Sequence, residues 1–121
     1  MQILVVDDDP VVLESCERVL SEEGFELALA SSTVEALVRL KEGCFDILLI
    51  DIKMPEKDGL FLMEQARQRC PDIPVLVMSG YPTPNTISRS TALGAKDFLA
   101  KPFTPDELIE AIHSVMGGEK R

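Results

Sequence analysis

The stretch FDILLIDIKMPEKDG, residues 45–59, combines an apolar run with a carboxylate at the point where that run ends. Residues 47–50 are all Ile or Leu, which is typical of a strand buried on both faces of a parallel sheet. Asp51 follows directly, where a buried strand would give way to a loop. A second apolar run, in ILVVDDDP at residues 3–10, also ends in acids. The pattern raises the question of whether these acids meet.

Apolar runs and helical patterns alternate along the whole chain. Strands are predicted at residues 2–6, 25–30, 46–50, 75–78 and 97–100. Helices are predicted from residue 10 up to Gly24 and at residues 31–43, 59–69, 85–93 and 104–116. This alternation predicts an α/β fold, a doubly wound parallel sheet of the flavodoxin-like type with five strands in the order 2-1-3-4-5. Strand 25–30 is expected at an edge because its two faces differ in polarity.

Capping residues mark several of the predicted helix starts. Asp9 is suited to cap the first helix, since its side-chain oxygen can accept a hydrogen bond from a backbone N–H of the first turn. Two capping boxes pair a hydroxyl residue with a glutamate three positions later: Ser32 with Glu35, and Thr104 with Glu107. These signals place helix starts directly after strand ends.

Length and composition limit the possible classes of protein. The 121 residues favour one domain, with a core at about residues 2–116 and a polar tail at 117–121. The net charge of −9 argues against direct binding to nucleic acid. No apolar run is long enough for a membrane span or a secretory signal, so no membrane association and a cytoplasmic location are expected.

The cysteines suggest neither a metal site nor a disulfide framework. Cys16, Cys44 and Cys70 lie far apart in the sequence, and His113 is the one histidine. A zinc site or disulfide is therefore not expected, and all three cysteines are interpreted as thiols in a reducing compartment. The single imidazole also argues against a hydrolase with a Ser/His or Cys/His pair.

Three acids are predicted to share one crevice. In a doubly wound sheet, functional groups collect beyond the carboxyl ends of the strands, at the switch point between strands one and three. Asp7 and Asp8 end the first strand, and Asp51 ends the third. Like charges at close range raise one another's pKa, and a hard divalent cation relieves their repulsion. Mg²⁺ fits best, since it accepts carboxylates together with waters and phosphate oxygens.

The remaining strand ends supply groups that suit a phosphoryl group. Strand four ends in Ser79 and Gly80, a hydroxyl next to a backbone amide, and strand five ends at Lys101. With a metal present, Asp51 is the natural nucleophile, and Ser79, the Gly80 amide and Lys101 can contact the phosphoryl oxygens. Each feature alone is an ordinary turn or cap, and Asp9 is interpreted only as a cap. Their coincidence at one edge predicts an aspartate that becomes phosphorylated.

On these residues the chain resembles the receiver domain of bacterial two-component response regulators, a CheY-like fold, over about residues 2–116. The matching segments are VVDD at 5–8, LLIDIKMPEKDG at 48–59, VMSG at 77–80 and AKPF at 100–103. The resemblance implies that Asp51 accepts a phosphoryl group from a sensor histidine kinase or phosphotransfer protein. It also implies that the domain catalyses only its own phosphorylation and dephosphorylation.

The resemblance assigns further roles near Asp51. Asp8 and Asp51 would bind Mg²⁺ directly, together with the backbone carbonyl of Lys53, and Asp7 would act mostly through water. Lys53 and Tyr81 would flank the attacking water and so set the lifetime of the phosphorylated state.

Other implied features concern the switch and its partners. Ser79 and Phe98 would change position on phosphorylation and alter the face formed by the fourth helix, fifth strand and fifth helix. The Lys101–Pro102 peptide bond would be cis. An output domain or effector protein, and a homodimer that forms on phosphorylation, are possible partners.

Three alternative classes fit parts of this pattern. A phosphatase of the haloacid dehalogenase type would need a second Asp where Lys53 stands. A flavodoxin-like flavin carrier would need a phosphate-binding loop where the chain has Asp7, Asp8 and Asp9. A degenerate receiver that serves only as an interaction module is disfavoured by the intact acids, hydroxyl and lysine.

Overall fold

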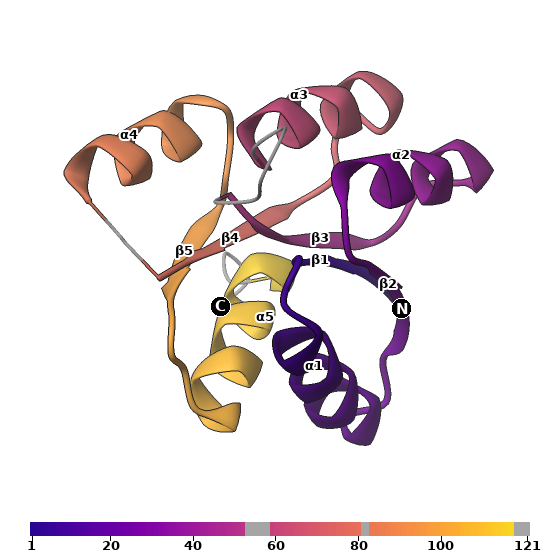
Figure 1. Cartoon of the computed structure of the whole chain (residues 1–121), viewed down its shortest axis with the longest axis vertical. Helices are drawn as coiled ribbons and strands as arrows, with labels where there is room; N and C mark the ends of the chain where they lie inside the picture. Colours follow the sequence, from indigo (N-terminus) through magenta and orange to yellow (C-terminus); the bar gives the residue numbers. More distant parts are fainter. Residues whose placement is uncertain (53–58, 81–82, 118–121) are drawn as a thin grey trace.

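Five parallel strands form a single sheet in the order β2-β1-β3-β4-β5, which confirms the predicted topology (Figure 1). The computed structural model describes residues 1–52, 59–80 and 83–117. The strands are β1 (Gln2–Val6), β2 (Glu26–Ala30), β3 (Ile47–Asp51), β4 (Val75–Ser79) and β5 (Asp97–Ala100). The helices are α1 (Pro10–Glu22), α2 (Thr33–Glu42), α3 (Gly59–Arg69), α4 (Pro84–Ala92) and α5 (Pro105–Gly117).

Helices cover both faces of the sheet. Figure 1 shows α1 and α5 on one face and α2, α3 and α4 on the other. Side chains alternate between the two faces: Leu48 and Ile50 pack into the cluster under α2 and α3, and Ile47 and Leu49 pack into the cluster with α1 and α5. This two-sided burial explains why the central strands are apolar throughout.

The strand register brings the ends of β1 and β3 together. β1 pairs with both β2 and β3, and Val6 lies opposite Ile50. The residues that follow, Asp7 and the strand-terminal Asp51, therefore leave the sheet side by side. β2 lies at one edge of the sheet, as the different polarity of its two faces predicted.

Two helix starts have the predicted caps. The Asp9 side chain accepts a hydrogen bond of 2.9 Å from the backbone N–H of Val11 at the start of α1. Thr104 and Glu107 form a reciprocal capping box at α5, with bonds of 3.1 and 2.8 Å. Both caps fix the direction in which the chain leaves the edge of the sheet where the strands have their carboxyl ends.

The start of α2 differs from a regular capping box. The Ser32 hydroxyl accepts a bond from the Glu35 N–H, as predicted. The Glu35 carboxylate, however, accepts from the backbone N–H and the hydroxyl of Ser31, one residue earlier than the box would place it. These two bonds lower the pKa of Glu35.

The cysteines contradict the sequence-based interpretation. Cys44 and Cys70 form a disulfide, with their Cα atoms 5.9 Å apart, so the prediction of three free thiols was wrong. In a parallel sheet the connections that lead into β3 and β4 both begin at the same edge, and this brings together two cysteines separated by 26 positions. The prediction of a reducing compartment was based on three free thiols, and it is therefore no longer supported. Cys16 is free and buried, as expected.

Other differences are small. α4 begins at Pro84, one residue before the predicted start, and α5 includes Gly117, which was assigned to the tail. Among the helices of the described residues, none combines the length and the apolar character needed to cross a membrane.

Candidate functional site

Three carboxylates meet at the carboxyl ends of β1 and β3, as predicted. Asp7 is fully buried and Asp51 is 4% exposed, whereas Asp8 lies on the surface. One oxygen from each residue can be chosen so that all three lie within 4.8 Å of one another. Asp7 Oδ1 also accepts a bond of 2.9 Å from the backbone N–H of Asp9, which links the acids to the start of α1.

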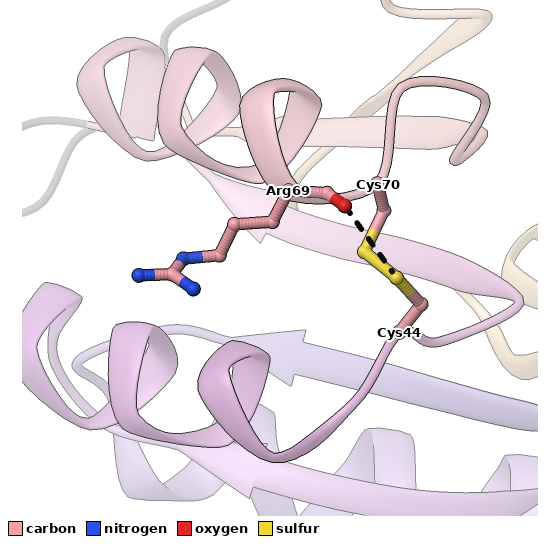
Figure 2. Close-up of a disulfide and its surroundings, with 3 residues drawn as sticks. All are labelled: Cys44, Arg69 and Cys70. Atoms are coloured by element: carbon pink, nitrogen blue, oxygen red, sulfur yellow. Dashed lines mark hydrogen bonds between the residues drawn. A yellow bond between two sulfur atoms is a disulfide. The ribbon is translucent and has the colours of Figure 1, made fainter.

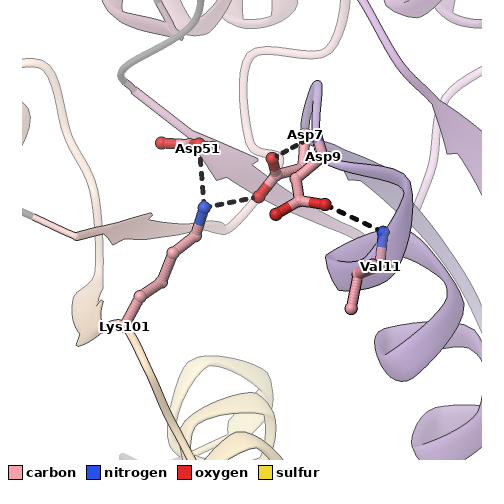
Figure 3. A network of polar contacts seen from close by, with 5 residues as sticks. All are labelled: Asp7, Asp9, Val11, Asp51 and Lys101. Carbon is pink, nitrogen blue, oxygen red and sulfur yellow. Dashed lines mark hydrogen bonds and ion pairs between the residues drawn. The ribbon is translucent and has the colours of Figure 1, made fainter.

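Lys101 bridges the two buried acids. Its Nζ atom lies 2.8 Å from Asp7 Oδ2 and 3.0 Å from Asp51 Oδ2, and Figure 3 shows the ammonium group between them. The backbone N–H of Lys101 donates to the carbonyl of Ser79 at 2.9 Å. The lysine is thus held at the end of β4 while its side chain reaches across to β1 and β3.

Burial shifts the pKa values of the charged groups in this cluster. Loss of solvent raises the pKa of Asp7 and the charge of Asp51 adds to this rise, and together they outweigh the opposing contacts with Lys101 and the Asp9 amide. Burial alone would lower the pKa of Lys101, but its close contacts with Asp7 and Asp51 raise the pKa overall. The lysine therefore stays charged, and its ammonium group lies between the carboxylates of Asp7 and Asp51.

The donor set fits a hard divalent cation. Asp7 Oδ2 is buried and, among the described residues, meets Lys101 as an ion pair without a hydrogen bond of regular geometry. Asp7, Asp8 and Asp51 offer only carboxylate oxygens, and one of the three faces solvent, where waters can complete a coordination shell. Such a set suits Mg²⁺ better than zinc, which prefers sulfur and nitrogen ligands.

The predicted phosphoryl-binding groups lie at the neighbouring strand ends. Ser79 is fully buried at the end of β4, and its neighbour Met78 is in register with Asp51. Gly80 follows on the surface. Phe98 is half-buried in β5 and packs against the core cluster under α2 and α3.

The remaining predictions divide into one confirmed and two that lie outside the described residues. The Lys101–Pro102 bond is cis, as expected from the resemblance. Lys53 and Tyr81, the residues expected to set the lifetime of the phosphorylated state, are not among the described residues. The backbone carbonyl of Lys53, expected as a metal ligand, is likewise outside them.

Sequence reasoning missed the role of Gly59. Its N–H donates to the carbonyl of Ile52 at 3.2 Å, which joins the first turn of α3 to the end of β3. A Cβ atom at Gly59 would lie 2.6 Å from both the Asp51 carbonyl oxygen and the Ile52 Cα. Gly59 was interpreted only as the first residue of the helix at 59–69, and the close approach depends on tertiary structure.

Comparison with known proteins shows the family to which the sequence is similar. The family model for the response regulator receiver domain matches residues 3–113. The chain is 38% identical over 116 residues to the response regulator MprA of Mycobacterium leprae, covering 96% of this chain and 51% of that protein. It therefore spans about half the length of the curated relatives of this kind.

Solved structures share the fold. A CheY-like response regulator receiver domain protein from Methanospirillum hungatei superposes with a TM-score of 0.91 at 31% identity, covering 98% of this chain and 95% of that one. The chemotaxis protein CheY4 of Vibrio cholerae gives a TM-score of 0.89 at 27% identity, with 94% and 97% of the two chains covered.

Proposed function

Because the chain belongs to the response regulator receiver domain family, whose members act in two-component signalling, we propose that Asp51 is its phosphoacceptor. The observation that carries this assignment is the bridge of Lys101 between Asp7 and Asp51. It places a buried carboxylate beside a fixed cation that can contact the oxygens of an incoming phosphoryl group.

The transfer is a displacement at phosphorus. A carboxylate oxygen of Asp51 forms a bond to phosphorus while the bond to the histidine nitrogen of the donor breaks, and that nitrogen keeps the electron pair. Lys101, the Ser79 hydroxyl and the Gly80 amide donate hydrogen bonds to the phosphoryl oxygens.

We assign the metal-binding role to the acid cluster. Asp8 and Asp51 would hold Mg²⁺ directly, with the carbonyl of Lys53, and Asp7 would act mostly through water. When bound, the ion would neutralise charge on the phosphoryl oxygens.

Mass spectrometry tests the assignment of Asp51. The chain is incubated with acetyl phosphate and Mg²⁺, and its intact mass should increase by one phosphoryl group. Asp51→Asn should abolish the adduct, whereas Asp72→Asn, a matched change of an exposed acid between α3 and β4, should leave it intact. An undiminished adduct on Asp51→Asn would refute the proposal.

Phosphorylation is proposed to act on the face formed by α4, β5 and α5. Ser79 moves toward the phosphoryl group, and the half-buried Phe98 turns inward into the space that is released. Backbone chemical shifts at residues 80–116 should then change on phosphorylation. If shifts change only at residues that line the acid cluster, this switch is not present.

The lifetime of the phosphorylated state is proposed to depend on Lys53 and Tyr81. Neither is an acid or amide that would orient an attacking water, so self-dephosphorylation should be slow. The double change Lys53→Asn with Tyr81→Glu should speed phosphate loss without preventing phosphate uptake. An unchanged rate of loss would contradict this role.

The partners follow from the same proposal. Response regulators work with histidine kinases, and we propose a sensor kinase or phosphotransfer protein as the donor for this chain. Residues 1–121 are proposed to form one cytoplasmic receiver domain that acts through an output domain, an effector or a phosphorylation-dependent homodimer. Direct contact with nucleic acid is not proposed, given the net charge of −9.

A further inference from the structure

Cys44 and Cys70 form a second chemical site, at the sheet edge opposite the acid cluster. Cys44 lies in the connection between α2 and β3, and Cys70 directly follows α3 (Figure 2). β3 begins near the disulfide at Ile47 and ends at Asp51, so the length of one strand separates the two sites. The proposed phosphoryl chemistry makes no use of this pair.

The two cysteine residues differ in accessibility. Cys44 is exposed, whereas Cys70 is 6% exposed and belongs to the core cluster under α2 and α3. A groove of about 370 Å³ lies beside the pair, and Cys44, Cys70 and Arg69 are among the residues that line it. A small thiol in this groove can attack the Cys44 sulfur, and Cys70, which also lines the groove, is the leaving group.

The surroundings suit the reduced form as well. Cys44 Sγ lies 3.8 Å from the carbonyl oxygen of Arg69, as Figure 2 shows. A disulfide sulfur has no hydrogen to donate, but a reduced Cys44 thiol would find this acceptor in place. Reduced Cys70 would pack against the core cluster on one side and line the groove on the other, from which its thiol can lose a proton to solvent. A reduced Cys44 thiol would therefore have a hydrogen-bond acceptor close by.

Cys16 provides an internal contrast. It is fully buried against the α1 and α5 cluster, and burial, with the charge of Asp7 adding to it, raises the pKa of its thiol to about 12. A thiol of this kind carries almost no thiolate at neutral pH and reacts slowly with disulfides.

We propose that Cys44 and Cys70 are a reversible thiol–disulfide exchange site for small thiols and disulfides of the glutathione class. In oxidation, the Cys44 thiolate attacks glutathione disulfide, forms a mixed disulfide and releases one glutathione thiolate. Cys70 then loses its proton to solvent and attacks the Cys44 sulfur, which releases the second glutathione. Two protein thiols are oxidised, and one glutathione disulfide is reduced to two thiols.

Exchange under native conditions is the first test. The whole chain is equilibrated in buffers of reduced and oxidised glutathione without denaturant, quenched with acid and measured by intact mass. The Cys44–Cys70 bond should form and break reversibly as the ratio changes, with Cys16 unmodified. A disulfide that can be reduced only after unfolding, or thiols that never pair in oxidised glutathione, would overturn the proposal.

Variants in which one of the two cysteines is replaced test which sulfur is attacked. Cys70→Ser keeps the accessible thiol and should take up one glutathione, whereas Cys44→Ser should react at least about tenfold more slowly. Equal rates would contradict the assignment of Cys44 as the entry point. If Cys70→Ser does not fold, peptide mapping of briefly oxidised wild-type protein gives the same answer. The mixed disulfide should then be found on Cys44, and finding it on Cys70 would be equally contradictory.

Discussion

At the scale of single residues, Lys101 compensates the charge of two buried acids. Its ammonium group lies within 3.0 Å of both Asp7 and Asp51, and its side chain is only 19% exposed. Removal of one member of such a cluster leaves charges in low dielectric with no partner, a larger cost than the pair itself contributes. The same lysine that is proposed to bind the phosphoryl group therefore also permits the acids to be buried.

Lys101→Met should consequently destabilise the fold by about 2 kcal/mol, less than for a fully buried pair because the lysine is partly exposed. Thermal unfolding without divalent ions measures this loss, and added Mg²⁺ should restore more stability to the variant than to the parent. Lys96→Met is the control, since Lys96 is exposed and outside the cluster. Similar melting temperatures for the two variants would show that the bridge does not stabilise the acids.

Asp8 and Asp9 are adjacent acids with different tasks. Asp9 caps α1 through Val11, so Asp9→Ala should cost about 1 kcal/mol while the stabilisation by Mg²⁺ persists. Asp8 is an exposed member of the metal-binding set, and Asp8→Ala should leave the cap intact and remove most of the shift in melting temperature caused by Mg²⁺. The measurement is a thermal melt of each variant with and without Mg²⁺. Equal shifts in both variants would contradict the assigned ligands.

At the scale of secondary-structure elements, α3 is held against the end of β3 through a glycine. Gly59→Ala would place a methyl group 2.6 Å from the Asp51 carbonyl oxygen, and the obstacle is backbone, which cannot rotate away. We expect a loss of about 2 kcal/mol and a reduced yield of phosphorylation, because β3 must shift with its terminal acid. Gly80→Ala is the control for stability, since a Cβ there would meet nothing within 4 Å. Chemical unfolding of both variants measures the loss of stability. Equal unfolding midpoints for Gly59→Ala and Gly80→Ala would contradict the predicted clash with β3.

Sequence patterns predicted the elements because each depends on local chemistry. The apolar run before Asp51 indicated a doubly buried strand, and Thr104 with Glu107 indicated a helix start; both were confirmed. The meeting of Asp7 and Asp51 was predictable as well, because strand order fixes which ends are neighbours. Contacts between connections were not predictable in this way. Gly59 and the pair Cys44–Cys70 show no local signal, since their roles arise only after distant segments pack together.

At the scale of the whole molecule, the parallel topology separates two chemistries. All five strands run in the same direction, so the carboxyl ends gather the acids, Ser79 and Lys101 at one edge. The connections that follow α2 and α3 return to the other edge, where the disulfide lies. The segment closed by the disulfide, residues 44–70, contains all of β3 and α3. The cross-link therefore restrains the part of the chain that carries Asp51, although it lies far from that residue along the strand.

Reduction of this disulfide should lower the free energy of unfolding of the entire fold. The bond closes a loop with a sequence separation of 26, and the lost loop entropy of the unfolded chain corresponds to about 3.5 kcal/mol. Urea unfolding of the oxidised and reduced protein measures the difference, with Cys44→Ser expected to match the reduced parent. Because that variant has no Cys44–Cys70 bond, a reductant should leave its unfolding midpoint unchanged. A reduced parent as stable as the oxidised one would show that the cross-link does not restrict the unfolded chain as its loop length predicts.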